Sequence, residues 1–172
     1  MDILEYANFW INRIHRPKIA TQEVESIHDI DFNNLKKLGV RLLIFDVDDT
    51  ITPHKRPLPR KTIRLLKKLK DFKIAFLSNC SESRRKELAK MIDVYIAPFS
   101  SKPGKIGFTH ILEKMSVPGS QAAMIGDKKS MDLWGAKIAG INHRILVKPY
   151  SEVFGGHKCS IFVRFFRKLD NI

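Results

Sequence analysis

Short apolar runs alternate along the chain with segments whose apolar residues recur every three or four positions. The apolar runs predict strands buried on both faces of a sheet, and the other segments predict amphipathic helices. In 60–72, for example, Ile63, Leu66 and Leu69 fall on one helical face and lysines cover the other. Strands joined by helices in this way predict a doubly wound α/β domain with a parallel sheet. The predicted strands are 41–47, 73–79, 93–99, 122–127 and 143–149, and the predicted helices are 60–72, 81–91, 105–115 and 129–140.

The length of 172 residues predicts one domain over 1–172, because two separate cores would need a longer chain. Its predicted core is 40–149, with a lead-in over 1–39 and a basic, aromatic C-terminal tail over 150–172. Residues 50–61, between the first predicted strand and its helix, are too few to form a separate cap domain. We therefore expect the carboxyl ends of the strands to stay open to a large ligand, or to one presented at a surface.

Three acidic residues, Asp46, Asp48 and Asp49, follow the first predicted strand almost directly. Mutual repulsion and desolvation make such a cluster costly unless a cation lies among the carboxylates. More polar residues stand at the ends of neighbouring strands, which is where doubly wound sheets bind their ligands. These residues are Ser78 and Asn79 after the second strand, Lys102 after the third and Asp127 after the fourth.

The composition narrows the function classes. A net charge of +13 and a pI near 9.9 predict an anionic partner (a nucleic acid, an anionic membrane surface or a phosphorylated substrate) or a basic surface that is simply solvated. We expect neither a membrane-spanning helix nor a secretory signal, because the required apolar patterns are missing. Cys80 and Cys159 predict reduced thiols in a cytoplasmic protein, and the scattered histidines do not favour a histidine-built metal site.

Four motifs follow one another along the chain: "FDVDDT" (45–50), "LSN" (77–79), "SSKPG" (100–104) and "IGDKKSMD" (125–132). Their order and spacing resemble those of the haloacid dehalogenase-like (HAD) phosphatases, over roughly residues 40–148. Each motif alone is common, whereas all four at successive strand ends are specific. The resemblance implies a HAD-like Rossmannoid fold and a phosphomonoester hydrolase that works through an aspartyl-phosphate.

The resemblance also implies a role for each matching residue. Asp46 is the expected nucleophile, and Asp48 is the expected general acid and base. The expected cofactor is Mg²⁺, held by the side chains of Asp46 and Asp127 and the backbone carbonyl of Asp48. Asp132 is expected to lie behind these ligands and to orient a metal-bound water. The expected phosphate-binding residues are Ser78, Asn79 and Lys102, with Asn79 and Thr50 also organising loop hydrogen bonds.

Simpler interpretations compete at several positions. Asp46 and Asp48 would also suit a helix N-cap followed by a turn carboxylate, but a cap does not require Asp127 and Lys102 on neighbouring strands. We expect Asp49 to serve the loop or a cap. Lys105 is a possible rival for the role expected of Lys102. We expect Lys128 and Lys129 to lie at a solvated helix start, and Cys80 to be a small buried residue.

Residues 24–53, "VESIHDIDFNNLKKLGVRLLIFDVDDTITP", resemble the entry segment of the capless subclass IIIA of this superfamily. That subclass includes bacterial YqeG-type proteins and the mitochondrial phosphatidylglycerophosphate phosphatase, and "GINHRILVKPY" (140–150) is likewise similar. The resemblance implies hydrolysis of phosphatidylglycerophosphate to phosphatidylglycerol, a step of phospholipid metabolism. The alternative substrates are a soluble sugar phosphate, a nucleotide or a nucleic-acid end, for which a basic surface would attract polyanions.

Both ends of the chain carry patterns that suit an anionic membrane surface. In "ILEYANFWINRIH" (3–15) apolar and aromatic residues share one helical face, and "HKCSIFVRFFRKL" (157–169) mixes aromatic with basic residues. The alternative is a pair of terminal helices packed on the sheet. We expect a cytoplasmic protein with peripheral contact at the inner face of a membrane, and the oligomeric state stays open.

Two non-enzymatic interpretations also exist. A receiver-like module uses an acidic cluster, a phosphorylatable aspartate and a lysine on a parallel sheet, and a basic scaffold would keep only the fold. Asp48, two residues after Asp46, favours the enzyme, because only a phosphatase that turns over needs this second acid.

Overall fold

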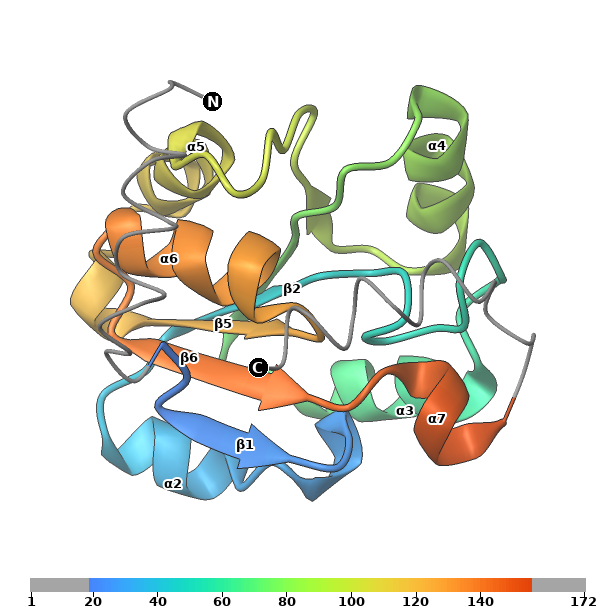
Figure 1. Cartoon of the computed structure of the whole chain (residues 1–172), viewed down its shortest axis with the longest axis horizontal. Helices are drawn as coiled ribbons and strands as arrows, with labels where there is room; N and C mark the ends of the chain where they lie inside the picture. The colour runs from blue at the N-terminus through green and yellow to red at the C-terminus, as the bar shows by residue number, and fades with distance from the viewer. Residues whose placement is uncertain (1–18, 156–172) are drawn as a thin grey trace.

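A computed structural model describes residues 19–155, which form a parallel sheet covered by helices on both faces (Figure 1). The 6-stranded sheet has the order β1-β6-β5-β2-β3-β4, and every neighbouring pair of strands is parallel. The predicted doubly wound α/β fold is therefore confirmed. The strands are β1 (Gln22–Val24), β2 (Leu42–Phe45), β3 (Lys73–Phe76), β4 (Tyr95–Ile96), β5 (Ala122–Gly126) and β6 (His143–Val147).

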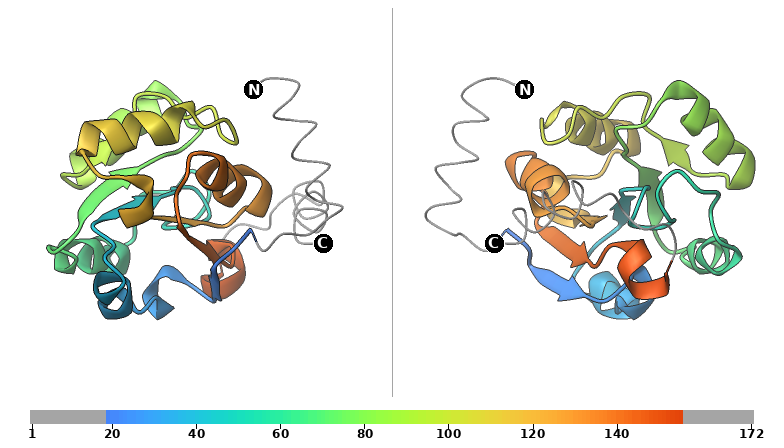
Figure 2. Two further views of the ribbon diagram at one scale, coloured as in Figure 1. Left: turned by 90° about the vertical axis from the view of Figure 1, so that its left-hand side faces the viewer. Right: turned by 45° about the vertical axis from the view of Figure 1, so that its right-hand side comes forward.

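The helices lie in two layers. Figure 1 shows α5 and α6 on one side of the sheet and α2 and α3 on the other, and Figure 2 shows the same separation from two further directions. The helices are α2 (Phe32–Lys37), α3 (Arg60–Lys68), α4 (Glu82–Met91), α5 (Ile106–Met115), α6 (Trp134–Ile138) and α7 (Tyr150–Phe154). Shorter turns are η1 (Ile27–Asp29), η2 (Gly119–Gln121) and the π-helical η3 (Lys129–Leu133).

The two central strands, β2 and β5, are buried along their whole length, as continuous apolar runs predict. Successive residues of a strand point to opposite faces, so β2 serves two cores. Leu43 and Phe45 belong to the cluster that includes Leu66 of α3. Leu42 and Ile44 belong to the other cluster, which includes Phe108 of α5. Packing against helices on both faces holds β2 and β5 in place, and with them the residues that follow each strand.

Local signals in the sequence explain where several helices begin and end. Asp31 caps α2 by accepting a hydrogen bond from the Asn34 backbone N–H, and Ser81 caps α4 in the same way through the Arg84 N–H. After α2 the chain turns at Gly39 with φ +84°, a conformation that glycine adopts without a steric cost.

Some elements differ from the prediction. The lead-in contributes the edge strand β1, which pairs with β6. It was not predicted, because Gln22 and Val24 are only partly buried, Glu23 is exposed, and the three residues form no apolar run. The predicted strand 93–99 shortens to Tyr95–Ile96, and the predicted helix 129–140 begins as a π-helical turn. Within 19–155 no helix is long and apolar enough to cross a bilayer. Cys159 and the patterns predicted in 3–15 and 157–169 lie outside the described residues.

Candidate active site

The site lies at the carboxyl ends of the central strands. β2 pairs with β5 on one side and with β3 on the other. The chain continues from β2 to β3 and from β5 to β6, in opposite directions along the sheet, and ligands bind at such a switch point. Asp46 directly follows β2, and its backbone N–H donates to the Ile125 carbonyl of β5 at 2.9 Å. Asp127 follows β5 at the same edge. The structure thus brings these two predicted site residues together from separate parts of the chain.

A buried lysine lies among the carboxylates. The Lys102 side chain is 4% exposed, and its Nζ donates to Oδ1 of Asp46 and, at 2.6 Å, to Oδ1 of Asp132. Burial lowers the pKa of this ammonium, but the negative charges of Asp132 and Asp46 outweigh burial and hold its pKa above the ordinary value. Lys102 is therefore a permanent cation inside the acidic cluster. Lys105, its predicted rival, is exposed and precedes α5.

Asn79 fixes the backbone of Lys102. Its Nδ2 donates to the Lys102 carbonyl and its Oδ1 accepts from the Lys102 N–H, both at 3.1 Å. This amide pairing places Asn79 as a support for Lys102, which agrees with the loop role predicted for it. Ser78, beside Asn79, is half-buried, and burial raises the pKa of the nearby free thiol of Cys80.

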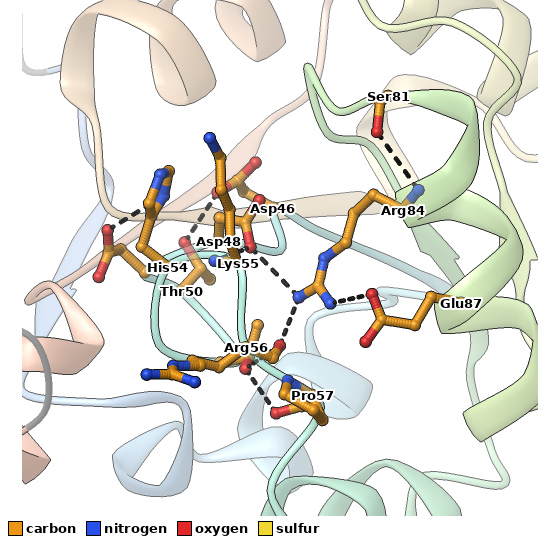
Figure 3. A network of polar contacts seen from close by, with 12 residues as sticks. Asp46, Asp48, Thr50, His54, Lys55, Arg56, Pro57, Ser81, Arg84 and Glu87 are labelled. Carbon is orange, nitrogen blue, oxygen red and sulfur yellow. Dashed lines mark hydrogen bonds and ion pairs between the residues drawn. The ribbon is translucent and has the colours of Figure 1, made fainter.

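Asp48 contacts the loop that follows it and Arg84 of α4 (Figure 3). Its Oδ1 accepts from the Lys55 backbone N–H at 2.9 Å and from Nη2 of Arg84 at 3.3 Å. Asp49 is buried and adopts a left-handed conformation with φ 68°, which aspartate tolerates better than most residues. This geometry supports the loop role predicted for Asp49.

Three buried carboxylates, those of Asp46, Asp127 and Asp132, each offer one oxygen within 4.8 Å of the others. Carboxylate oxygens are the ligands that a hard divalent cation prefers, so the donor set fits Mg²⁺. Both oxygens of Asp132 already accept hydrogen bonds, from Lys102 at Oδ1 and from the Lys128 N–H at Oδ2. These bonds tie Asp132 to Lys102 and to the backbone that follows β5, and its expected place behind the metal ligands stays a prediction.

Two hydrogen-bond donors line the remaining sides of this carboxylate group. Thr50 Oγ1 lies 3.3 Å from Oδ2 of Asp46 and 3.4 Å from Oδ1 of Asp127. The Lys128 ammonium lies 3.3 Å from Oδ1 of Asp127, whereas Lys129 pairs with Glu23. Lys128 is thus part of the site and is not the solvated helix start that we predicted.

Gly126 lets Asp132 reach the site. A Cβ atom at position 126 would lie 2.5 Å from both Cβ and Oδ2 of Asp132. The π-helical turn η3 carries Asp132 back toward the strand end, and this close approach requires glycine.

We expect Gly126→Ala to displace Asp132 from Lys102 and to lower the free energy of unfolding by about 1–3 kcal/mol, the usual cost of overpacking. Chemical denaturation measures the change, and phosphate-ester hydrolysis should fall with it. An unchanged unfolding midpoint would show that the strand end accepts the extra methyl group.

Sequence reasoning missed Arg84 and Gly126. Arg84 is buried against Asp48, but its position in a helix with neighbouring basic residues gives no sign of that burial. Gly126 had a signal, since a glycine between an apolar strand and an aspartate indicates a close backbone approach.

Three comparisons relate the chain to known proteins. The family model for haloacid dehalogenase-like hydrolases matches residues 54–140. The chain is 28% identical over 136 residues to "Probable phosphatase YqeG" of Bacillus subtilis (strain 168), which covers 77% of this chain and 78% of that protein.

Two solved structures share the fold. One is an uncharacterized protein from Listeria monocytogenes serotype 4b, with TM-score 0.52, 18% identity and coverage of 76% of this chain and 99% of that one. The other is a hypothetical protein from Xanthomonas campestris, with TM-score 0.50, 14% identity and coverage of 72% of each chain. The enzyme interpretation is confirmed over the receiver-like module and the scaffold, and so is the predicted phosphatase class. The chain belongs to the haloacid dehalogenase-like hydrolase family.

Proposed function

We propose that this protein is a Mg²⁺-dependent phosphomonoester hydrolase that works through an aspartyl-phosphate on Asp46, with phosphatidylglycerophosphate as its substrate. The observation that carries the proposal is the convergence of Asp46, Asp127 and the Lys102 ammonium at one sheet edge. A carboxylate nucleophile, a divalent-cation site and a fixed cation together are what phosphoryl transfer uses.

In this mechanism Asp46 attacks the phosphorus atom, and the bond between phosphorus and the alcohol oxygen breaks. Asp48 donates a proton to the departing alkoxide and then takes a proton from the attacking water. Water displaces Asp46 from phosphorus, which releases inorganic phosphate and restores the free carboxylate. Lys102 and Ser78 bind the phosphoryl oxygens and balance their charge through these steps. Asn79 supports this binding by fixing the Lys102 backbone.

Mg²⁺ would be held by the side chains of Asp46 and Asp127 and by the Asp48 carbonyl. When bound there, it would neutralise the phosphoryl charge and orient the phosphorus for attack. A cavity of about 380 Å³ borders Asp127 at the carboxyl ends of β1 and β6, and it leaves room for water molecules on this side of the site.

The lipid substrate has separate support. Only a loop joins β2 to α3, so within the described residues no inserted domain covers the site. His54, Lys55 and Arg56 in this loop are exposed beside Asp48, and the whole chain carries a net charge of +13. A site with an open rim and a basic surface suits a phosphate presented at an anionic membrane.

We expect the purified protein to release phosphate from phosphatidylglycerophosphate in mixed vesicles with Mg²⁺, and to stop when EDTA removes the metal. A panel of soluble sugar phosphates, nucleotides and 5′-phosphorylated oligonucleotides, assayed beside the lipid, gives the comparison. Higher kcat/KM on the lipid is the predicted result. Turnover of soluble esters with none on the lipid would contradict the proposed lipid substrate, but it would leave the proposed reaction class in place.

Binding to anionic vesicles adds an independent measurement. The proposal predicts co-sedimentation with phosphatidylglycerol vesicles that weakens as salt rises, because exposed basic residues are screened. Vesicles made only of zwitterionic lipid are the control, and equal binding to both would contradict an electrostatic attraction.

A further inference from the structure

Two basic side chains are buried within residues 19–155, Lys102 and Arg84. Lys102 forms an ion pair with Asp46, and Arg84 forms an ion pair with Asp48, so each of the two acids has its own buried cation. The Arg84 side chain is only 8% exposed. Burying a guanidinium costs free energy that only well-placed partners recover, so the fold is built to hold this group in one place.

The guanidinium joins three segments. Nη1 donates to Oε2 of Glu87 at 2.8 Å within α4, while Nη2 donates to Oδ1 of Asp48 and to the carbonyl of Arg56. Figure 3 shows the side chain extending from α4 toward the loop that carries Asp48. Arg84 therefore locks α4 and residues 52–57 onto the acid. A lysine in its place would offer a single point of charge and not this planar fork.

The donors to Asp48 meet on one oxygen. Oδ1 accepts from both Arg84 Nη2 and the Lys55 N–H, whereas no residue within 19–155 donates a hydrogen bond to Oδ2. N–H donors occupy the lone pairs of the oxygen that they contact. Oδ1 is therefore the oxygen by which the protein holds Asp48.

We infer that Arg84 is a positioning residue that, with the Lys55 backbone, holds the Asp48 side chain by Oδ1 in the orientation that the general acid and base needs. The inference rests on the proposed function, because it concerns the acid and base of that reaction. Arg84 touches neither substrate nor metal in this account. It acts through Asp48 by fixing the orientation of its carboxyl group.

Leaving-group dependence tests the inference. An alkyl ester such as glycerol phosphate needs a proton on its departing oxygen, whereas p-nitrophenyl phosphate releases a stable phenolate without one. kcat/KM reports the chemistry up to the first irreversible step, which is departure of the alcohol. We expect Arg84→Gln to lower kcat/KM on glycerol phosphate by about 10-fold or more beyond its effect on p-nitrophenyl phosphate.

A double-mutant cycle separates positioning from a general structural effect. In an Asp48→Asn background, Arg84→Gln should cause almost no further loss on glycerol phosphate, because the group through which it acts is already gone. Lys86→Gln is the control on the same helix, since Lys86 is exposed and pairs with Glu82, and it should leave the ratio unchanged. Thermal unfolding checks each variant. Where Arg84→Gln does not fold, Glu87→Gln, which removes the anchor of the guanidinium, should show a smaller loss of the same selectivity.

Two results for Arg84→Gln would overturn the inference: equal losses of kcat/KM on the two esters, or a further full loss in the Asp48→Asn background. The proposed function would still stand in either case, provided that the wild-type protein hydrolyses the esters. A wild-type protein that hydrolyses neither ester with Mg²⁺, while it also fails on the lipid, would overturn both.

Discussion

Replacing Asp46 by asparagine should lower the rate of phosphate release by at least about 10³-fold, because a neutral amide is a poor nucleophile toward phosphorus. The measurement is steady-state phosphate release with Mg²⁺ on whichever ester the wild-type protein hydrolyses. Asparagine keeps the shape of the side chain and its position after β2. A variant that keeps the wild-type rate would contradict the role of Asp46.

Asp46→Asn must also remain folded for the result to be informative. Lys102 keeps its second partner, Asp132, at 2.6 Å, so the buried ammonium is not left alone. We therefore expect cooperative unfolding with a modest change in midpoint. Asp71→Asn is the matched control, because Asp71 is an exposed aspartate that pairs with Lys36 away from the site.

Lys102→Met should damage both stability and activity. Without the ammonium, the buried carboxylates of Asp46 and Asp132 face each other uncompensated, and breaking a buried ion pair in this way costs about 3–5 kcal/mol. Urea denaturation near neutral pH measures the loss in the free energy of unfolding. Hydrolysis should fall as well, because the cation that balances the phosphoryl charge is gone.

The pH dependence of this loss of stability follows from the direction in which the pKa of Lys102 is shifted. The pKa of Lys102 is raised above 10.5 in the folded protein, so the stabilisation by its charge is complete below pH 10.5 and is lost as pH rises through the folded pKa. The difference between wild type and Lys102→Met should accordingly persist at neutral pH and shrink in strong alkali. Lys105→Met, at an exposed lysine three positions later, should change the free energy of unfolding by less than about 0.5 kcal/mol. Equal losses for the two variants would contradict the account.

The sequence predicted the fold well where burial alone determines structure. β2 and β5 are buried on both faces, and runs such as "LLIF" leave no other interpretation. The edge strand β1 escaped prediction because half-exposed residues held by pairing with β6 need no apolar run. The π-helical turn η3 escaped as well, since its cause is the contact between Asp132 and the strand end, far from any helical periodicity.

The site was predictable only in part, for a similar reason. Asp46 and Asp127 directly follow β2 and β5, and a parallel sheet brings such ends together whatever lies between them. Lys102 lies in the loop between β4 and α5, and its motif marked it as a site residue. Arg84 and Arg85 are neighbouring residues of the same type in the sequence. Arg84 is nevertheless buried against Asp48, whereas Arg85 donates to the Cys80 carbonyl. The difference depends on where the Arg56 carbonyl and Glu87 lie in the folded chain, which no local pattern encodes.

The most direct measurement locates the covalent phosphate. The protein, mixed with Mg²⁺ and p-nitrophenyl phosphate and quenched in acid, can be digested and its peptides mapped by mass spectrometry. The Asp48→Asn variant should accumulate the intermediate, because the base that activates water is missing while the activated ester still reacts. Phosphate should be found on Asp46, and it should be absent from the Asp46→Asn variant. Phosphate on another residue, or turnover with no phosphorylated protein in either form, would contradict it.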